Sequence, residues 1–552
     1  MKDYRFGKSI IGDIVFDWET GFAYKKDYPK AHIPDKLYYP ADYIIYKENN
    51  KYYAKNGRTG EVEKQDTDAA TVIQYALDHL TSGRTWKEKV ILKGDFDIGD
   101  NTILIPSYTI FELQGRIHAT GKILEANTVE QIEIRGGKYS NEGGVGIEII
   151  SVDGFRIEGV EMYDVSDDVI RVLDSKHGLI TGNYIHDTHH DGIEISKGCE
   201  DINIENNLVI NPGDDGIDIV VVNEEYTYHV NIIGNIVINA PGNGIKNYGG
   251  RHVNIIGNIV INPSSYGISV AFFEYPDGTY NKPKYVTVVG NIVSGAGKCG
   301  IDLALVDPCE EIDAVVSNNY IENSTEYGIW LYHVSKVAVV GNTVKGNGYS
   351  GIGANTASEL TIEGNIVELN NKHGIYLKNC NYNIIANNRI NKNARDTSAN
   401  YWGIVLETPT SGYGIYNIIK GNIITDPDGL MYKCAGDTGY ADNNVFIDNI
   451  VKDCKTPPCI STVGVDDVIK GNKGYVTENS GVATFSGDGS TTEFKIEHGL
   501  VKAPSKYGVS PLTPDADAAR TITVDDTYII ITFSSAPPSG TDNLKFGWWV
   551  KV

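Results

Sequence analysis

The chain has 552 residues, with 72 acidic against 48 basic side chains and a formal net charge of −24. Such an acidic body repels nucleic-acid phosphates and anionic membranes, so we expect neither nucleic acid nor membrane insertion. No stretch approaches the roughly 20 apolar residues of a membrane-spanning helix, and no signal peptide is visible. The seven cysteines contain no Cys-x-x-Cys pair, which argues against a zinc or redox site.

The first expected elements precede residue 81. Residues 1–65 form a tyrosine-rich segment with a hairpin expected around Asn49–Asn50. Residues 66–80, DTDAATVIQYALDHL, open with an N-cap signal and predict an amphipathic helix. Its apolar face comprises Val72, Ile73, Ala76, Leu77 and Leu80. Because a repeat array exposes an apolar edge at its end, we expect this helix to cap the repeats that follow.

Two short phrases then recur along the chain. One is roughly apolar-x-Gly-Asn-x-apolar, often at intervals of 23 residues, as between Asn342 and Asn365. Its asparagines are Asn183, Asn207, Asn235, Asn258, Asn291, Asn319, Asn342, Asn365, Asn388, Asn422, Asn449 and Asn472. The other phrase is Gly-Ile-x-apolar, from GIEII at 146–150 to GIVLE at 403–407.

Short alternating segments with Gly and Asn between them predict strands, and the interval leaves no room for crossover helices. The economical arrangement is a solenoid whose coils stack strand over strand, with the asparagines bonded in a ladder along one turn. We therefore predict an all-β fold, a right-handed parallel β-helix over residues 66–475 including the capping helix. After about residue 475 the rhythm stops, and residues 476–552 read as a β-sandwich module.

Alignment of the coils on Gly-Ile places variable residues in two columns, one before the glycine and one after the isoleucine. Because residues flanking an inward isoleucine point outward, both columns are expected on one outer surface. Three consecutive coils stack acids there, and this crowding raises carboxyl pKa values in a way that suits acid–base chemistry. The candidate substrate-binding residues are Asp168, Arg171, His189, His190, Glu194, Asp218, Asn243, Lys246 and Tyr266, around the candidate catalytic residues Asp191, Asp214 and Asp215.

The helix of residues 66–80, the following VILKGDFDIGDNTILIPSYTIFEL and the coils behind them resemble the pectate-lyase-like β-helix superfamily. This superfamily includes polygalacturonases, polysaccharide lyases, epimerases and phage tailspikes. The resemblance covers roughly residues 60–475. The C-terminal segment looks like small β-modules appended to viral tail-fibre proteins.

Within these coils HHDGIEI and GDDGIDI are similar to polygalacturonase motifs. The resemblance implies that Asp191 and Asp214 orient or activate water as base, while Asp215 protonates the leaving oxygen. The family's Gly-His-Gly is replaced by Gly242-Asn243-Gly244, and no Arg-Ile-Lys follows. These departures argue against polygalacturonate itself as the substrate.

The expected function is that of an extracellular or virion-surface protein that binds a polysaccharide or cell-surface glycan and hydrolyses it, without a required cofactor. A Ca²⁺-dependent lyase with Arg171 or Lys246 as base is one alternative, since dense carboxylates suit Ca²⁺. A non-catalytic tail-fibre or adhesin is another. Asp191 and Asp215 also fit a purely structural turn role. Tailspike relatives imply a homotrimer by analogy alone.

Overall fold

The computed structural model describes residues 41–222, 225–274, 280–409 and 411–552, together with three short strands near the N-terminus. These strands, β1 (Ser9–Ile11), β2 (Ile14–Asp17) and β3 (Phe22–Lys25), form an antiparallel sheet. The rest of the predicted segment before residue 41 lies outside the described residues. The chain divides into two compact units, Met1–Thr287 and Val288–Val552, which are described separately.

The predicted hairpin is present in the first unit. Strands β4 (Tyr43–Glu48) and β5 (Lys51–Asn56) pair antiparallel, and β6 (Val62–Asp66) follows. Asn49 and Asn50 join β4 to β5 with φ of 47° and 61°, the left-handed conformation of a two-residue hairpin loop. Because β4 also pairs parallel with β7 (Glu88–Asp97), the helical sheet begins ahead of the predicted boundary at residue 66.

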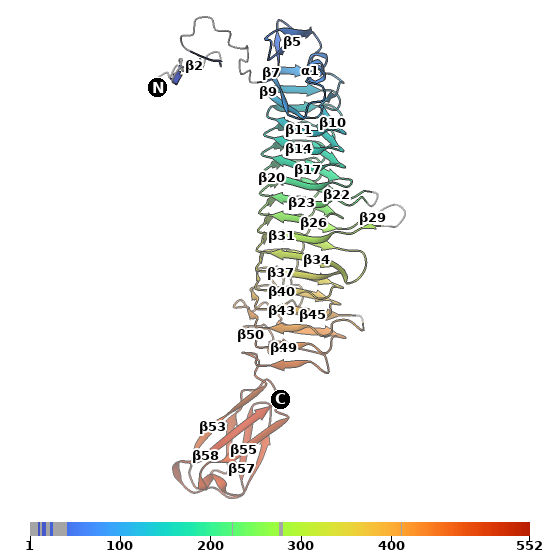
Figure 1. Ribbon diagram of the computed structural model, residues 1–552. Coiled ribbons are helices and arrows are strands. Elements are labelled where there is room, and N and C mark those ends of the chain that lie inside the picture. The colour runs from blue at the N-terminus through green and yellow to red at the C-terminus, as the bar shows by residue number, and fades with distance from the viewer. Residues whose placement is uncertain are drawn as a thin grey trace. The chain divides into compact units, whose positions relative to one another are not determined.

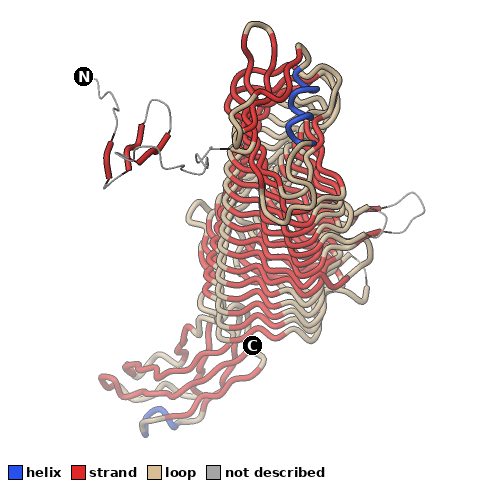
Figure 2. Tube along the Cα trace, turned by 45° about the horizontal axis from the view of Figure 1, so that its top comes forward, coloured by secondary structure: helices blue, strands red, loops and turns tan. Residues whose placement is uncertain are grey.

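The helix predicted to cap the coils is α1, Ala69–Asp78. It begins at Asp68, whose carboxylate accepts hydrogen bonds from the backbone N–H groups of Ala70 and Thr71. All five residues of the predicted apolar face are buried. The helix packs against β4–β8 at the start of the stack, where Figure 2 shows it in blue.

Three parallel ladders run through the coils of the first unit, and successive rungs are visible in Figure 1. The first ladder contains β7, β9 (Thr109–Ala119), β11 (Glu130–Arg135), β14 (Asp153–Glu158), β17 (Lys176–Thr181), β20 (Glu200–Glu205), β23 (Tyr228–Ile233) and β26 (Arg251–Ile256). The second contains β12 (Lys138–Asn141), β15 (Glu161–Tyr163), β18 (Tyr184–His186), β21 (Leu208–Ile210), β24 (Ile236–Ile238) and β27 (Ile259–Ile261). The third contains β8 (Ile103–Leu104), β10 (Leu124–Asn127), β13 (Ile147–Ile150), β16 (Ile170–Leu173), β19 (Ile193–Ser196), β22 (Ile217–Val220), β25 (Ile245–Tyr248) and β28 (Ile268–Ala271).

A short hairpin, β29 (Phe273–Glu274) and β30 (Tyr280–Asn281), precedes β31 (Lys284–Val289), the strand that contains the boundary between the units. The second unit repeats the three ladders. Its first ladder contains β34 (Glu310–Ser317), β37 (Val334–Val340), β40 (Thr361–Glu363), β43 (Ile384–Ala386), β46 (Ile418–Lys420), β49 (Val445–Ile447) and β52 (Val468–Lys470). Its second contains β32 (Ile292–Ser294), β35 (Tyr320–Glu322), β38 (Thr343–Lys345), β41 (Ile366–Glu368), β44 (Arg389–Asn391), β47 (Ile423–Thr425) and β50 (Ile450–Lys452). Its third contains β33 (Ile301–Ala304), β36 (Ile329–Tyr332), β39 (Ile352–Asn355), β42 (Ile375–Lys378), β45 (Trp402–Thr408), β48 (Lys433–Gly439) and β51 (Ile460–Ser461).

The predicted asparagine ladder is confirmed, and all twelve of its residues are buried. In the first unit, Asn207 Oδ1 accepts hydrogen bonds from the backbone N–H of Asn183 (3.0 Å) and from its side-chain amide (2.9 Å). The same pair of bonds links each further rung, through Asn258 in this unit and from Asn291 to Asn472 in the second. Each asparagine thus supplies a hydrogen-bond acceptor to the turn of the preceding coil, because the buried backbone N–H group there cannot bond to water.

Residues 478–551 form two antiparallel sheets of three strands each. One is β53 (Glu478–Gly487), β58 (Gly540–Lys551) and β55 (Lys506–Pro511), and the other is β54 (Glu493–Glu497), β57 (Tyr528–Phe533) and β56 (Arg520–Val524). A short 3₁₀ helix, η1 (Pro514–Asp517), precedes β56. Phe494, Ile531 and Phe546 bring strands of both sheets into one apolar core. The predicted strands are confirmed and form antiparallel sheets, while the sandwich arrangement stays a prediction.

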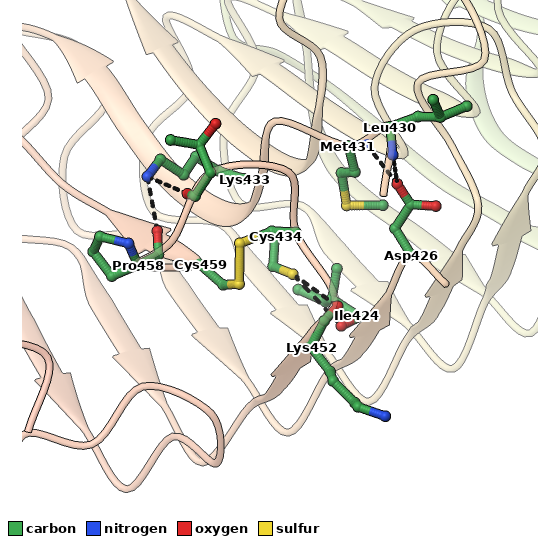
Figure 3. Close-up of a disulfide and its surroundings, with 11 residues drawn as sticks. Ile424, Asp426, Leu430, Met431, Lys433, Cys434, Lys452, Pro458 and Cys459 are labelled. Carbon is green, nitrogen blue, oxygen red and sulfur yellow. Dashed lines mark hydrogen bonds between the residues drawn. A yellow bond between two sulfur atoms is a disulfide. The ribbon is translucent and has the colours of Figure 1, made fainter. Parts of the chain in front are cut away.

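Of the cysteines near the end of the coils, Cys454 and Cys459 form a disulfide, and Cys434 is free and buried (Figure 3). The Cys434 thiol faces the carbonyl oxygens of Ile424 (3.7 Å) and Lys452 (3.6 Å). The sequence had left the pairing of these three cysteines open. None of the described helices has the length and apolar character that a membrane span requires.

Candidate active site

Four neighbouring strands of the third ladder, β16, β19, β22 and β25, carry the predicted second column. Their parallel register aligns Arg171 with Glu194, Glu194 with Asp218, and Asp218 with Lys246. On each strand the preceding isoleucine is buried in the core, so these charged side chains project from the opposite face. The order along the stack is therefore cation, acid, acid, cation, as the sequence alignment predicted.

The first column stacks beside the second through its own hydrogen bonds. Asp191 Oδ1 accepts a bond from the backbone N–H of Asp215 (2.8 Å), and Asp215 Oδ1 accepts one from the backbone N–H of Asn243 (2.5 Å). Asn243 Oδ1 in turn accepts a bond from the Tyr266 N–H (3.3 Å). One oxygen of Asp191 and one of Asp215 therefore bond to a backbone N–H group of a turn, which is the structural role that the sequence left open as an alternative.

Four acids of the two columns are less exposed than is expected for side chains on an outer surface. Asp168 is 0% exposed, Asp191 5%, Asp215 2% and Asp218 3%. They cover one another at the spacing of adjacent strands, ~4.8 Å, and long cationic side chains lie across them. The columns lie on the outer face as predicted, but these four acids are covered there, while Asp214 and His189 are exposed at its rim.

Arg171 organises the first half of the site. Its guanidinium contacts Asp168 Oδ2 (2.5 Å), Asp167 Oδ1 (3.0 Å) and Glu194 Oε2 (3.4 Å), and His190 Nδ1 contacts the other Asp168 oxygen. Burial alone would raise the pKa of Asp168, but Glu194, Arg171 and His190 lower it. Burial and the adjacent Asp168 raise the pKa of Glu194 to about 9. At neutral pH, Glu194 is therefore protonated beside an ionised Asp168.

Lys246 organises the second half. Its ammonium donates to Asp215 Oδ2 and Asp218 Oδ2, both at 2.9 Å. Burial would lower the pKa of Lys246, but the charges of Asp218 and Asp215 raise it above its ordinary value. Burial raises the pKa of Asp218 well above its ordinary value, and Asp218 Oδ1 is buried without a hydrogen-bond partner among the described residues.

Asp191 lies between these two halves. Burial and the neighbouring charge of Asp215 raise the pKa of Asp191 to about 7. One oxygen each of Asp191, Asp214 and Asp215 lies within 4.8 Å of the others. Burial and the charge of Asp215 also raise the pKa of Asp214, which remains exposed. The cluster thus combines carboxyl groups of different proton affinity at one point.

The sequence of the chain matches that of a known protein family. The sequence profile described as "Right handed beta helix region" matches residues 122–273 and 304–516, more than half of the chain. The chain belongs to the right-handed β-helix family. The predicted right-handed parallel β-helix is thereby confirmed.

No curated protein matches this β-helix protein. Solved structures similar to it include the surface adhesin PfbA of Streptococcus pneumoniae, at 14% identity over 63% of this chain and 90% of that chain, with a TM-score of 0.44. A tailspike protein of E. coli bacteriophage HK620 in complex with a pentasaccharide has 11% identity over 90% and 92%, with a TM-score of 0.48. The catalytic unit of a GH87 alpha-1,3-glucanase from Streptomyces thermodiastaticus has 13% identity over 74% and 66%, with a TM-score of 0.44.

Some predicted site residues of this β-helix lie apart from the charge cluster. His189 is exposed, and its backbone N–H donates to Val165 O. Tyr266 reaches the cluster through its backbone bond to Asn243. Conversely, the prediction omitted Glu148, which lies 3.5 Å from Arg171 and also contacts Lys122. Glu148 stands in the second column, directly next to Arg171, so its position was the available signal.

Two groups of carboxylates on the β-helix have the spacing of cation ligands, Asp191 with Asp214 and Asp215, and Asp168 with Asp191 and Glu194. Carboxylate oxygens are the ligands that Ca²⁺ prefers. Lys246 and Arg171, however, already occupy Asp215 Oδ2 and Asp168 Oδ2. The donor set therefore fits Ca²⁺ only after two ion pairs have been rearranged, and Ca²⁺ stays a prediction.

Gly242 leaves the space that the carboxylates of Asp214 and Asp215 occupy. A Cβ atom at this position would overlap both Asp214 Oδ1 and Asp215 Oδ1. Gly242→Ala is therefore expected to displace both carboxylates while leaving the coil stacked. We expect at least about a tenfold loss of any activity that uses these acids, because small misplacements of catalytic groups are costly. Circular dichroism and turnover measured together check this; unchanged turnover would contradict it.

Proposed function

We propose that this protein binds a polysaccharide across the coils of β16–β25 and hydrolyses it by acid–base catalysis at Asp191, Asp214 and Asp215. One observation supports the proposal most: Asp191 has a pKa of about 7 beside two further carboxyl groups within 4.8 Å. Glycoside hydrolysis uses a protonated and an ionised carboxyl group in proximity. A pKa near the working pH is what an efficient general acid requires.

The hydrogen bonds favour particular roles. Both oxygens of Asp215 already accept bonds, Oδ1 from Asn243 and Oδ2 from Lys246, so this side chain has little room to present a proton. Asp191 Oδ2 has no hydrogen-bond donor in the part of the chain that the structure describes, and its nearest cation is His190 Nδ1 at 3.8 Å. We therefore assign Asp191 as the proton donor and the exposed Asp214 as the base. Asp215 is assigned to stabilise positive charge that develops on the substrate.

The charge of the site favours a neutral polysaccharide. A uronate would require a cation to bind its carboxylate, and Arg171 and Lys246 are already paired with acids of the protein. The same pairing weakens the lyase alternative. A lyase base must lose its proton, whereas these acids raise the pKa values of both Arg171 and Lys246.

A panel of neutral and acidic polysaccharides tests this function. We expect reducing ends to be released from a neutral polysaccharide, with saturated products. Unsaturated products that absorb in the ultraviolet would indicate a lyase and overturn the hydrolase proposal. Glycan binding without any cleavage would indicate the adhesin alternative. Asp214→Asn serves as the matched variant, because it changes one exposed carboxylate of the cluster.

An extracellular or virion-surface location is part of the same proposal. The disulfide between Cys454 and Cys459 supports it, because disulfides persist mainly in oxidising surroundings. The homotrimer remains a prediction from the superfamily resemblance.

A further inference from the structure

A second polar column lies on the first ladder, away from the acid site. It occupies the second residue of successive strands: His177 on β17, Asp201 on β20, His229 on β23 and His252 on β26. All four residues are left-handed, with φ between 53° and 55°. This conformation interrupts the alternation of the strand, so that Glu200 and Asp201, although consecutive, are both exposed.

Two histidines of this column, His177 and His229, approach Asp201 from either side along the stack. Its Oδ1 lies 3.3 Å from His229 Nδ1, and its Oδ2 lies 3.7 Å from His177 Nε2. Glu200 Oε1 lies 3.7 Å from the same His229 nitrogen. These groups come from three successive coils, and each side chain is about half exposed, between 49% and 56%.

We propose that Glu200, Asp201 and His229 form a binding site for a divalent transition-metal ion, with Zn²⁺ as the best match. One ligand atom from each of the three residues lies within 4.8 Å of the others. Zn²⁺ binds imidazole nitrogen and carboxylate oxygen at about 2.0–2.2 Å, so its tetrahedral ligands lie about 3.4 Å apart. The distances of 3.3 Å and 3.7 Å at His229 bracket this value.

The ligand chemistry selects the ion. Imidazole favours Zn²⁺ and its neighbours over Mg²⁺ and Ca²⁺, which bind oxygen ligands. His177 borders the site. Its Nδ1 lies 2.7 Å from Asp153 Oδ1, which orients the ring and leaves Nε2 directed at Asp201. His177 is not one of the three proposed ligands; it lies beside the ligand Asp201 as an outer neighbour.

A bound ion would join β20 to β23, two rungs whose connection is longer than the common 23-residue interval. The step from Asp201 to His229 is 28 residues, because an insertion follows β22. A metal ion that links Glu200 and Asp201 to the next coil would fasten the stack at a rung where the connecting chain exceeds the common interval. Since binding occurs only in the folded state, Zn²⁺ is expected to raise the unfolding temperature.

Calorimetric titration of the full chain with ZnCl₂ at neutral pH tests the site. We expect His229→Ala and Asp201→Ala each to lose one equivalent of Zn²⁺, or to bind that equivalent at least tenfold more weakly. The Zn²⁺-dependent rise in unfolding temperature should shrink in both variants. His118→Ala, a histidine outside the column, is the control and should bind as the unsubstituted protein does.

The difference between variants is decisive because the carboxylates of the acid site also have the spacing of cation ligands. Equal stoichiometry and affinity in the unsubstituted protein, His229→Ala and Asp201→Ala would overturn the proposal. Absence of Zn²⁺ binding to the unsubstituted protein would overturn it too, and would leave these residues as a surface ion-pair network. Mg²⁺ in place of Zn²⁺ should show no difference among the variants.

Discussion

Asp191→Asn is expected to reduce hydrolysis by at least about 100-fold, the usual contribution of a general acid or base. The amide keeps an oxygen that can accept the bond from the Asp215 N–H (2.8 Å in the unsubstituted protein), so the turn is preserved. It cannot deliver a proton to a leaving group. Turnover of the polysaccharide cleaved in the panel measures this effect. Activity equal to that of the unsubstituted protein would show that Asp191 serves only the turn.

The same substitution is expected to increase stability above pH 7. The pKa of Asp191 is raised from 3.8 to about 7, so the folded state binds its proton more tightly than the unfolded state does. Stability from this group is therefore greatest at low pH and is lost as the pH rises from about 4 through 7. Asparagine carries no charge to bury, so this loss should disappear in the variant.

Unfolding temperatures of both proteins across this pH range measure the effect. Asp95→Asn, which changes an exposed aspartate, is the control and should leave the pH dependence as it is. A parallel loss of stability and activity in Asp191→Asn would contradict the proton-donor role, because it would indicate a damaged fold. Lower activity with higher stability at alkaline pH is the result that a catalytic acid predicts.

Asn365→Ala is expected to lower the free energy of unfolding by about 3 kcal/mol or more, since it leaves several buried polar groups unpaired. Asn365 Oδ1 accepts from the backbone N–H (2.9 Å) and side-chain amide (3.0 Å) of Asn342. Its own amide donates to Val339 O (2.8 Å) and Asn388 Oδ1 (2.9 Å). Denaturant titration checks the loss of these four bonds.

Asn391→Ala is the matched control in the same unit. Asn391 is only half-buried, and its Oδ1 accepts a bond from the Thr425 hydroxyl (3.1 Å). We expect its removal to cost below about 1 kcal/mol, the typical net value of one such bond. Similar losses for both variants would contradict the structural role assigned to the ladder.

The fold was largely predictable because each coil repeats the same local requirement. The Gly-Asn phrase marks a turn whose asparagine must bond to the next coil. The Gly-Ile phrase predicts the register that aligns Glu194 with Asp218. A second ladder escaped prediction. Asn347, Asn370 and Asn393 bond in the same way, but their local sequences share no such phrase.

The chemistry of the site was less predictable because it depends on contacts between distant residues. Lys246 donates to Asp215 although the two residues are 31 positions apart in the sequence. This bond occupies an oxygen of Asp215, and for that reason we propose Asp191 as the proton donor. Burial of the aspartates likewise depends on side chains from several coils. The Zn²⁺ site was hidden for another reason, since strict strand alternation would have turned either Glu200 or Asp201 inward.

The bonds between ladder asparagines run in one direction, from the N–H groups of one asparagine to Oδ1 of the asparagine in the coil that follows it in sequence. A newly made coil therefore lacks the acceptor for its turn until the next coil has left the ribosome. At synthesis rates of about 5–20 residues per second, one interval of 23 residues takes roughly 1–5 s. The helix can then be built during translation rung by rung, with only its newest turn incomplete.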